Sequence, residues 1–520
     1  MDEALTDLTG SMSLRSDSYD SVRETFRWDV PERFNIGVDV TDKWAATDPD
    51  RVAIIDGNKG LNASFGELSQ ESNRLANVLV SKGLQKGDRV AVLAPQRIET
   101  AIAHAAIFKA GAISVPLFSL FGHEALTHRL QDSAARFVIA DTAGMAKLAE
   151  MQGALPALEH VIDMDGAGWD ELTQASDSFD PVETKSDDPA LIIYTSGTTG
   201  SSKGALHAHR VLLGHLPGVE MSHGGLPKPG DCLWTPADWA WIGGLLDVLL
   251  PALHYGLPVV AKRFEKFDPE QALQLMQDCK VTATFLPPTA LRMLRQVDRP
   301  GERWNLSLRS IASGGESLGE ELPRWAQQEF GIGINEFYGQ TECNMIVSAC
   351  DAWFANCPGA MGKPTPGHDV RIVDDEGHEL ALGEEGHIAV GAPDPVMFLH
   401  YWNNPDATAE KFAGDMLITG DRGYADGDGF IHFVGRADDV ITSAGYRIGP
   451  AEIEDCLLRH PAVSAVGVVG VPDALRTEVV TAFVVLRAGV EGKLELAREL
   501  QEHVRSRLEW PPVSARGAFH

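Results

Sequence analysis

The residues best suited to chemistry form a run of glycines and hydroxyl side chains, YTSGTTGSSKG, at residues 194–204. Glycine lets the backbone approach an anion closely, and backbone amides together with Ser and Thr hydroxyls can hold phosphate oxygens. Lys203, near the end of the run, supplies a positive charge for those oxygens. We therefore predict a phosphate-binding loop with these members: Thr195, Ser196, Gly197, Thr198, Thr199, Gly200 and Lys203.

Local elements must place this loop at the edge of a sheet. The apolar run ALIIY just before it predicts a buried strand, and the segment after Gly204 is expected to begin a helix. Open α/β sheets bind ligands at such strand ends. The loop does not follow the Walker pattern, because Lys203 is followed by Gly204 and not by Ser or Thr. A flexible surface linker is the alternative, although linkers seldom follow a buried strand so directly.

Strands and helices are predicted to alternate on both sides of the loop. Before it, the pattern gives a strand, helix, strand, helix and strand at residues 89–95, 98–110, 112–118, 123–133 and 137–141. After it, a strand, a helix and a strand are expected at residues 258–262, 269–279 and 282–288. Such alternation predicts parallel sheets with right-handed crossovers, and hence two stacked α/β subdomains.

Two further regions follow. Residues 361–391 read as short strands and turns of a β-rich subdomain. Past residue 435, we predict helices at residues 450–459 and 494–508 and strands at 462–469 and 479–486, which make a small α+β lid. The last helix carries an apolar stripe that should dock on a sheet: Leu494, Ala497, Leu500, Val504 and Leu508.

The acidic composition disfavours polyanions as partners. The 520 residues include 44 Lys plus Arg against 74 Asp plus Glu, a formal net charge of −30, which disfavours nucleic acid and anionic membranes as partners. No apolar stretch is long enough to span a bilayer, and residues 1–25 read as a disordered acidic leader with no signal peptide. We expect a cytoplasmic protein, and a homo-oligomer stays open.

Cysteine spacing agrees with a reducing compartment. The six cysteines include no CxxC pair. Cys343, Cys350 and Cys357 recur every seven residues, but metal ligands are usually spaced more tightly, and Pro358 interrupts any helix that would align them. This spacing therefore disfavours a metal site built on the three cysteines.

Four more motifs follow the loop, each moderately specific alone. SGGESL begins at Ser313, FYGQTE covers residues 337–342, ITGDRGY covers residues 418–424, and GRADDVITSAGYRIGPAEIE runs from Gly435 to Glu454. Their order resembles that of the adenylate-forming superfamily, and in particular the AMP-forming acyl-CoA synthetases of the medium-chain type. The resemblance covers residues 30 to 508. Together with the leader at 1–25, it gives three expected domains, the other two being an adenylate-forming domain at 26–435 and a lid at 436–520.

The resemblance implies an acid–thiol ligase of fatty acid metabolism that uses ATP, Mg²⁺ and coenzyme A. A carboxylic acid would react with ATP to give an acyl-adenylate, which a thiol then attacks. Two rival functions stay open: loading of a carrier protein instead of CoA, and nucleotide binding with little catalysis.

Nucleotide contacts are carried over from the family residue by residue. Glu342 would hold Mg²⁺, Thr341 would bond the α-phosphate, and Lys203 and Arg436 would complete the catalytic set. The other implied contacts are Tyr338 stacked on adenine, Gly314, Gly315 and Glu316 on the opposite wall, Gln340, and Asp421 on the ribose hydroxyls. Structural alternatives are a core aromatic for Tyr338, a solvated loop carboxylate for Glu342, a turn residue for Asp421 and a surface ion pair for Arg436.

The lid carries the second set of implied roles. Asp438 occupies the hinge at which the lid rotates between the two half-reactions. The CoA passage would be formed by Ser443, Ala444, Gly445, Tyr446 and Arg447, although a purely structural role is the alternative for Arg447.

Substrate size is inferred from the acyl pocket. Acetate-specific relatives have a tryptophan where this chain has Gly339, and its removal should leave an open slot, because an aromatic side chain buries roughly 150–250 Å². Trp239 and Trp241 resemble the pocket wall of medium-chain enzymes, with an ordinary core position as the alternative. We expect a short-to-medium-chain acid, and Gly339→Trp is expected to shift preference toward acetate.

The chain departs from the family at its end. Relatives carry a lysine that bridges the carboxylate and the α-phosphate, whereas no lysine follows Lys493 here. Truncation or a frameshift is the expectation, with Leu500, Val504 and Leu508 left partly uncovered. Adenylation would then be slower by on the order of 10²–10³.

Overall fold

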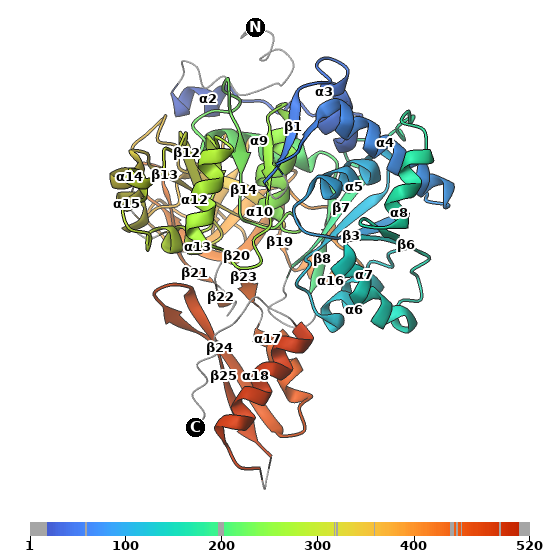
Figure 1. The fold of residues 1–520 in the computed structure, drawn as a ribbon. Coiled ribbons are helices and arrows are strands. Elements are labelled where there is room, and N and C mark those ends of the chain that lie inside the picture. The colour runs from blue at the N-terminus through green and yellow to red at the C-terminus, as the bar shows by residue number, and fades with distance from the viewer. Residues whose placement is uncertain are drawn as a thin grey trace.

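The computed structural model describes residues 18–57, 60–195, 202–316, 318, 321–357, 359–436, 441–443, 446–448, 450–487 and 490–508. Figure 1 shows a large body of sheets and helices from which the C-terminal elements project as a smaller unit. The described strands form four sheets, three in the body and one in the projecting lid.

A seven-stranded sheet contains the predicted βαβαβ unit. Its strands in spatial order are β18 (His400–Tyr401), β8 (Lys203–Ala208), β7 (Pro189–Thr195), β4 (Ile113–Leu117), β3 (Arg89–Leu93), β5 (Phe137–Ala140) and β6 (His160–Asp163). β3 pairs in parallel with both β4 and β5, so the predicted parallel arrangement is confirmed. The crossovers contain α5 (Ile98–Lys109) and α6 (His123–Asp132).

A nine-stranded sheet forms the second α/β subdomain. Its strands in spatial order are β15 (Lys363–Pro364), β14 (Cys343–Ser348), β13 (Ile334–Gln340), β12 (Ser310–Gly314), β11 (Ala283–Phe285), β9 (Leu233–Trp234), β10 (Val259–Ala261), β1 (Val52–Asp56) and β2 (Asn62–Ser64). The predicted elements around β10 and β11 are confirmed, including α12 (Pro269–Asp278) between them.

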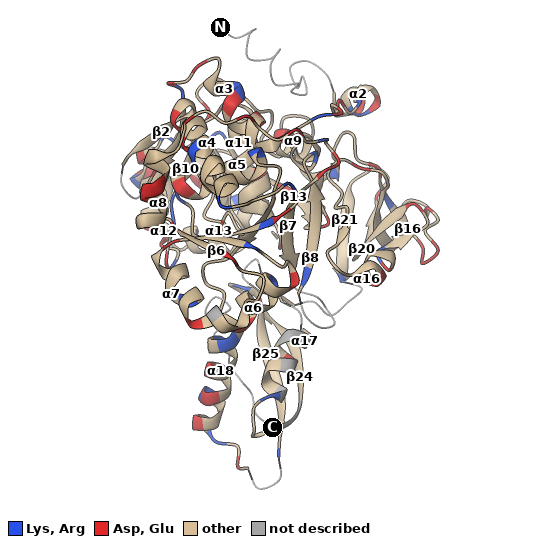
Figure 2. Cartoon of the chain, turned by 90° about the vertical axis from the view of Figure 1, so that its right-hand side faces the viewer, with Lys and Arg blue, Asp and Glu red and all other residues tan. Residues whose placement is uncertain are grey.

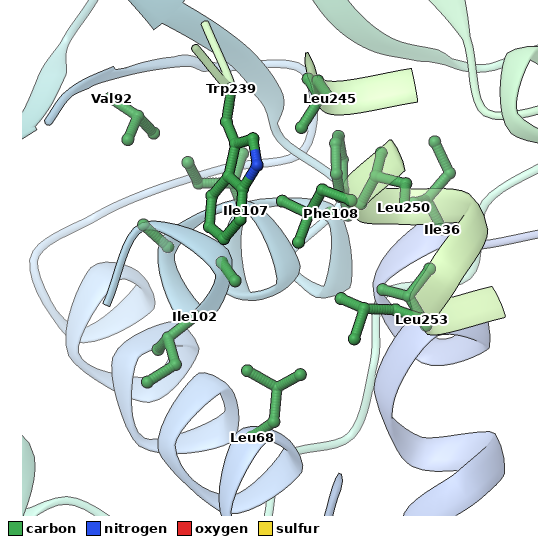
Figure 3. Close-up of a cluster of buried hydrophobic side chains, with 14 of the residues drawn as sticks. Ile36, Leu68, Val92, Ile102, Ile107, Phe108, Trp239, Leu245, Leu250 and Leu253 are labelled. Atoms are coloured by element: carbon green, nitrogen blue, oxygen red, sulfur yellow. The ribbon is translucent and has the colours of Figure 1, made fainter. Parts of the chain in front are cut away.

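Helices cover and join these two sheets. Besides those already given, they are the π-helical η1 (Val38–Asp42), α3 (Lys43–Ala45), α4 (Phe65–Ser81), α7 (Thr142–Met151), the 3₁₀-helical η2 (Gln152–Ala154), α8 (Ala167–Asp170), the 3₁₀-helical η3 (Glu171–Gln174), α9 (Val211–Ser222), α10 (Ile242–Gly244), the π-helical η4 (Leu245–Leu249), α11 (Leu250–His254), α13 (Pro288–Leu294), α14 (Pro300–Arg303), α15 (Glu321–Phe330) and α16 (Pro405–Ala409). The largest buried cluster joins strands of both sheets through α4, α5, α9 and α11. Figure 3 shows part of it, with Trp239 among Val92, Ile107 and Leu245.

A buried lysine lies at this helical layer. The ammonium of Lys109 is fully enclosed, with 0% of the side chain exposed, and donates to Asp42 Oδ1 at 2.6 Å, Asn73 Oδ1 at 2.7 Å and Ser72 Oγ at 2.9 Å. Burying a charge is costly unless it is paired and hydrogen-bonded, and here three acceptors meet the three protons of the ammonium. Lys109 thus ties α5 to α4 and to the segment before α3.

The β-rich region is larger than the sequence predicts. Its sheet runs β16 (Val370–Val373), β17 (Gly386–Gly391), β20 (Met416–Ala425) and β19 (Phe412–Ala413), with β21 (Ile431–Arg436) paired to β20. The sheet therefore continues to Arg436 instead of ending near residue 391.

The lid is a four-stranded sheet with two helices. Its strands in order are β23 (Tyr446–Ile448), β22 (Ile441–Ser443), β25 (Thr477–Leu486) and β24 (Val463–Asp473), covered by α17 (Pro450–Leu458) and α18 (Leu494–Leu508). Leu500 and Leu508 are buried, at 3% and 6% exposed, so the expectation that they are partly uncovered is wrong for these two, whereas Val504 is half-buried. Leu494, the first residue of α18, is 76% exposed and does not belong to the buried stripe.

Two local predictions are also wrong. The leader contains α2 (Tyr19–Thr25), which Ser18 caps and which Tyr19 anchors by donating its hydroxyl to the Pro364 carbonyl at 2.8 Å. The segment after Gly204 is strand β8 and not a helix. β8 is buried along nearly its whole length, so it lacks the polar alternation by which a half-buried strand is recognised.

The distribution of charged residues and the hydropathy of the helices bear on what the sequence predicts. On the side that Figure 2 shows, Lys, Arg, Asp and Glu are scattered over the elements. Within the described part of the chain, helices that could cross a bilayer are absent.

Candidate active site

Two of the predicted phosphate-loop residues, Thr195 and Lys203, lie at one end of a hairpin. β7 and β8 run antiparallel, and Thr195 is the register partner of Lys203. Thr195 and Lys203 are therefore side by side at this end. The remaining predicted members, Ser196, Gly197, Thr198, Thr199 and Gly200, lie outside the described residues.

Glu342 lies at the turn of a second hairpin, formed by β13 and β14. Its side chain is 4% exposed and accepts a short hydrogen bond from the Tyr401 hydroxyl. Lys203 Nζ lies 5.3 Å from the centre of the Tyr401 ring. Thr341 precedes Glu342 in the same turn. The structure thus brings the predicted Mg²⁺ ligand and the predicted phosphate-binding lysine to one aromatic side chain.

Tyr401 was not predicted. It lies on β18, which pairs with β8 so that Tyr401 is opposite Ala205, 59 positions after its partner Glu342. The only signal in the sequence is an aromatic pair, Tyr401 and Trp402, and nothing in that pair points to Glu342. Only the pairing of β18 with β8 places the hydroxyl.

The predicted ribose site is assembled from two sheets. The Tyr338 hydroxyl donates to Asp421 Oδ2 at 2.6 Å, and Arg436 donates to Asp421 Oδ1 at 2.7 Å. Asp421 and Arg436 are register partners on β20 and β21. Gln340 donates to the Thr419 carbonyl at 2.8 Å and so joins β13 to β20. These four predicted residues converge, and the Asp421 carboxylate is held with both oxygens bonded.

A glycine corner borders Tyr338. Gly314 at the end of β12 is the register partner of Phe337, and a Cβ at Gly314 would lie 2.7 Å from the Phe337 carbonyl oxygen. Gly315 has φ +89°, a conformation that favours glycine. Gly314 is therefore needed because β12 and β13 approach each other closely, whereas the space beside Gly315 is open.

Glu316 joins this corner to the lid. It accepts from Arg292 at 3.0 Å and from Thr477 of the lid at 2.8 Å. Burial raises the pKa of Glu316, and the bonds from Thr477 and Arg292 oppose that rise. The lid therefore contacts a residue that the sequence assigns to the adenine site.

A second contact places the lid near the predicted acyl pocket. The Tyr446 ring lies 5.1 Å from the Trp241 ring and 6.2 Å from the Phe118 ring. Burial raises the pKa of Tyr446. Ser443 is 5% exposed and donates to the Glu478 carbonyl at 2.6 Å within the lid. Asp438, Ala444, Gly445 and the side chain of Arg447 lie outside the described residues.

The two predicted tryptophans differ in position. Trp239 is 1% exposed and belongs to the main hydrophobic cluster (Figure 3). This position fits the alternative that Trp239 is an ordinary core residue. Trp241 is half-buried and faces Tyr446. Of the two, Trp241 is positioned at the boundary with the lid.

The open slot predicted at Gly339 is not present. Gly339 lies at a bulge in the β13–β14 hairpin, where a Cβ would collide with the Met345 backbone nitrogen and lie 2.6 Å from the Asn344 Cα. Backbone atoms of β14 fill the space, so a glycine is needed at position 339 for the two strands of the hairpin to approach each other this closely. The expected shift of Gly339→Trp toward acetate loses its basis.

Gly339→Ala should instead destabilise the hairpin, by about 1–3 kcal/mol, because overpacking against backbone forces strands apart. We expect a lower urea midpoint and weaker nucleotide binding, with an unchanged preference among acids. Gly435→Ala is a matched control, since a Cβ there meets open space. Full stability of Gly339→Ala would contradict the close approach.

Two buried histidines near the loop have no catalytic geometry. Burial lowers the pKa of His207 and of His209 to about 3, so both rings are neutral near pH 7. His209 Nδ1 accepts from the Ile36 amide at 3.2 Å. Both rings are buried, so they belong to the packed interior of the fold.

Comparison with known proteins agrees with this geometry. The AMP-binding enzyme family matches residues 41–402, and the AMP-binding enzyme C-terminal domain matches residues 452–516. Mouse acyl-coenzyme A synthetase ACSM3, mitochondrial, is 35% identical over 517 residues, which cover 94% of this chain and 87% of that protein.

Solved structures show the same architecture. A Brucella canis acyl-CoA synthetase is 32% identical, with TM-score 0.74, covering 97% of this chain and 95% of the other. ATP-bound MatB from Rhodopseudomonas palustris is 30% identical, with TM-score 0.71, covering 94% of each chain. Because both family models match and a relative is 35% identical over 94% of this chain, the chain belongs to the AMP-binding enzyme family, and within it to the acyl-CoA synthetases.

Proposed function

We propose that this protein is an AMP-forming acyl-CoA synthetase for short-to-medium-chain carboxylic acids. A carboxylate oxygen of the acid would attack the α-phosphorus of ATP, and pyrophosphate would leave. The CoA thiol would then attack the acyl carbonyl, lose its proton to solvent, and release AMP. Adenylation is needed because a carboxylate alone has a poor leaving group.

The observation that carries this proposal is that two anchoring groups meet at the β13–β14 hairpin. Asp421 of β20 is held by Arg436 and by Tyr338 of β13, and Glu342, at the turn of the hairpin, is held by Tyr401 near Lys203. A carboxylate with two oxygens suits the two ribose hydroxyls, and a lysine suits phosphate. ATP lying from Asp421 to Lys203 would present its α-phosphate near Thr341.

The residues at the phosphate end fit Mg²⁺. Glu342 offers a hard carboxylate oxygen in a nearly buried position, which is the ligand type that Mg²⁺ prefers. When bound, the ion would neutralise charge on the phosphates. Thr341 would donate to the α-phosphate, and Lys203 would balance the charge that passes to the leaving pyrophosphate.

The lid contacts support a role in the second half-reaction. Tyr446 lies against Trp241, so the strand pair that carries the predicted CoA residues faces the large domain in this structure. We infer that this lid orientation corresponds to thioester formation, and that Trp241 borders the acyl group. The length of the acyl chain is proposed only from the resemblance to medium-chain enzymes, because the position of Gly339 does not support a deeper acyl pocket.

Tyr401→Phe should weaken the response to Mg²⁺ without changing the fold. The hydroxyl orients Glu342, and a hydrogen bond to a charged group contributes about 1.5–3 kcal/mol, or roughly 10- to 150-fold in Mg²⁺ affinity. We expect a higher Mg²⁺ concentration for half-maximal pyrophosphate release, with little change in the KM for the acid. Tyr424→Phe is the matched control, since Tyr424 lies on β20 of the β-rich sheet, where its ring stacks on His432. Equal Mg²⁺ curves for Tyr401→Phe and wild type would refute the positioning role.

A panel of straight-chain acids tests the substrate class. Acetate, butanoate, hexanoate, octanoate and dodecanoate are supplied with ATP and CoA, and AMP is measured. The highest kcat/KM is expected for butanoate to octanoate. Acetate or dodecanoate as the best substrate would overturn the proposed chain length while leaving the reaction class intact.

We also propose a cytoplasmic location. The six cysteines are free thiols, as in a reducing compartment. The mouse relative is named as mitochondrial, so fractionation of cells expressing the tagged chain distinguishes the two compartments.

A further inference from the structure

Three chemically different side chains that belong to none of the motifs used above meet where the β20–β21 hairpin lies against the segment after β14. Cys357 belongs to the segment after β14, Asp426 directly follows β20, and His432 lies on β21. The thiol sulfur, one carboxylate oxygen and one imidazole nitrogen all lie within 4.8 Å of one another, and each residue is half-buried. The group therefore unites a soft sulfur, a nitrogen and an oxygen donor at one point.

Two of these side chains are already fixed in place. Asp426 Oδ1 accepts the backbone N–H groups of Asp428 and Phe430, both at 3.0 Å, which leaves Oδ2 to face His432 Nε2 at 2.9 Å. The His432 ring is stacked on the Tyr424 ring, with centres 4.6 Å apart and planes 3° from parallel. A binding site with fixed ligands loses little entropy when it is filled.

The backbone also holds the cysteine segment close. The Met361 amide donates to the Ile431 carbonyl at 2.9 Å, and the Ile431 amide donates to the Gly362 carbonyl at 2.8 Å. These bonds join the chain just after Cys357 to the strand that carries His432. The approach of the thiol to the other two donors thus follows from strand pairing and is a fixed feature of the fold.

We propose that Cys357, Asp426 and His432 form a zinc-binding site with water as the fourth ligand. Zn²⁺ accepts Cys, His and carboxylate ligands in tetrahedral geometry, at about 2.3 Å for sulfur and about 2.0–2.2 Å for nitrogen and oxygen. Mg²⁺ and Ca²⁺ prefer oxygen ligands only, so this mixed set disfavours them. Binding involves no redox change: the thiol releases its proton to solvent, and His432 keeps a single proton, on Nδ1.

Zinc at this point would act on the hairpin that presents the ribose site. Asp426 and His432 lie on the β20–β21 hairpin, which also carries Asp421 and Arg436. An ion that joins this hairpin to Cys357 would stabilise it against separation from the nine-stranded sheet. The inference does not depend on the nucleotide chemistry proposed above.

Cobalt titration tests the site directly. The full chain is treated with EDTA, dialysed, and titrated with Co²⁺ alone, because cobalt bound to a thiolate absorbs in the near ultraviolet. Wild type should develop this band, saturate at one equivalent, and lose it when Zn²⁺ is added. Cys279→Ser is the matched control, since Cys279 is also a half-buried thiol, and it should behave like wild type.

Cys357→Ser should lose the band. His432→Gln should weaken binding by more than the ~10–100-fold that loss of an outer-shell partner costs. Melting temperatures in EDTA report whether the variants fold, and Zn²⁺ should raise the melting temperature of wild type and Cys279→Ser only. An unchanged band in Cys357→Ser, or no band in wild type, would overturn the proposal.

Discussion

Glu342→Gln should lower the rate of pyrophosphate release from ATP and acid by about 10²–10³-fold, the usual effect of removing a preorganised group from a site of developing charge. Glutamine keeps the shape of the side chain and can still accept from Tyr401, but it removes the negative charge proposed to hold Mg²⁺. The measurement is the rate of pyrophosphate release under single-turnover conditions, in excess Mg²⁺.

The second half-reaction provides an internal control for this variant. Acyl transfer from a supplied acyl-adenylate to CoA involves no triphosphate, so Glu342→Gln should retain most of it. Glu384→Gln, an exposed carboxylate at a turn of the β-rich subdomain, should leave both steps unchanged. A Glu342→Gln enzyme that releases pyrophosphate at the wild-type rate would exclude the proposed role of this carboxylate.

Lys109→Ala should lower the free energy of unfolding by about 3 kcal/mol, the lower end of the range for breaking a buried ion pair. The lower end applies because the Asp42 side chain is 28% exposed and can be partly solvated after the lysine is lost. Ser72 and Asn73 would also lose the donor that now satisfies them. Urea unfolding followed by tryptophan fluorescence gives the value.

Lys82→Ala is the matched control for that experiment. Lys82 forms an ion pair with Glu171 at 2.9 Å, with side chains 30% and 54% exposed, and exposed pairs contribute less than about 1 kcal/mol. A Lys109→Ala loss no larger than that of Lys82→Ala would show that the buried network contributes little to stability.

Local signals explain what could be predicted from the sequence. The βαβαβ unit was predicted because each strand is an apolar run bounded by turns, and each helix has a clear end. The convergence of Tyr338, Asp421 and Arg436 followed from motifs whose order matches that of the family, although the hydrogen bond from the Tyr338 hydroxyl to Asp421 could not be read from those motifs.

Non-local geometry explains the rest. Tyr401 reaches Glu342 only because β18 pairs with β8, and no pattern in LHYWNNP indicates that pairing. Gly339 looked like an empty slot because the bulge that brings Asn344 and Met345 against it depends on hairpin register. The helix α2 is short, and it is anchored by a residue more than three hundred positions away, at Pro364.

The most direct test of the account is the product ratio from ATP, hexanoate and CoA, measured by chromatography. We predict that AMP and hexanoyl-CoA form in equal amounts, and that omitting the acid abolishes both. Formation of ADP in place of AMP, or of AMP with no acyl-CoA while a carrier-protein thiol is acylated instead, would contradict the assignment as an AMP-forming acyl-CoA synthetase.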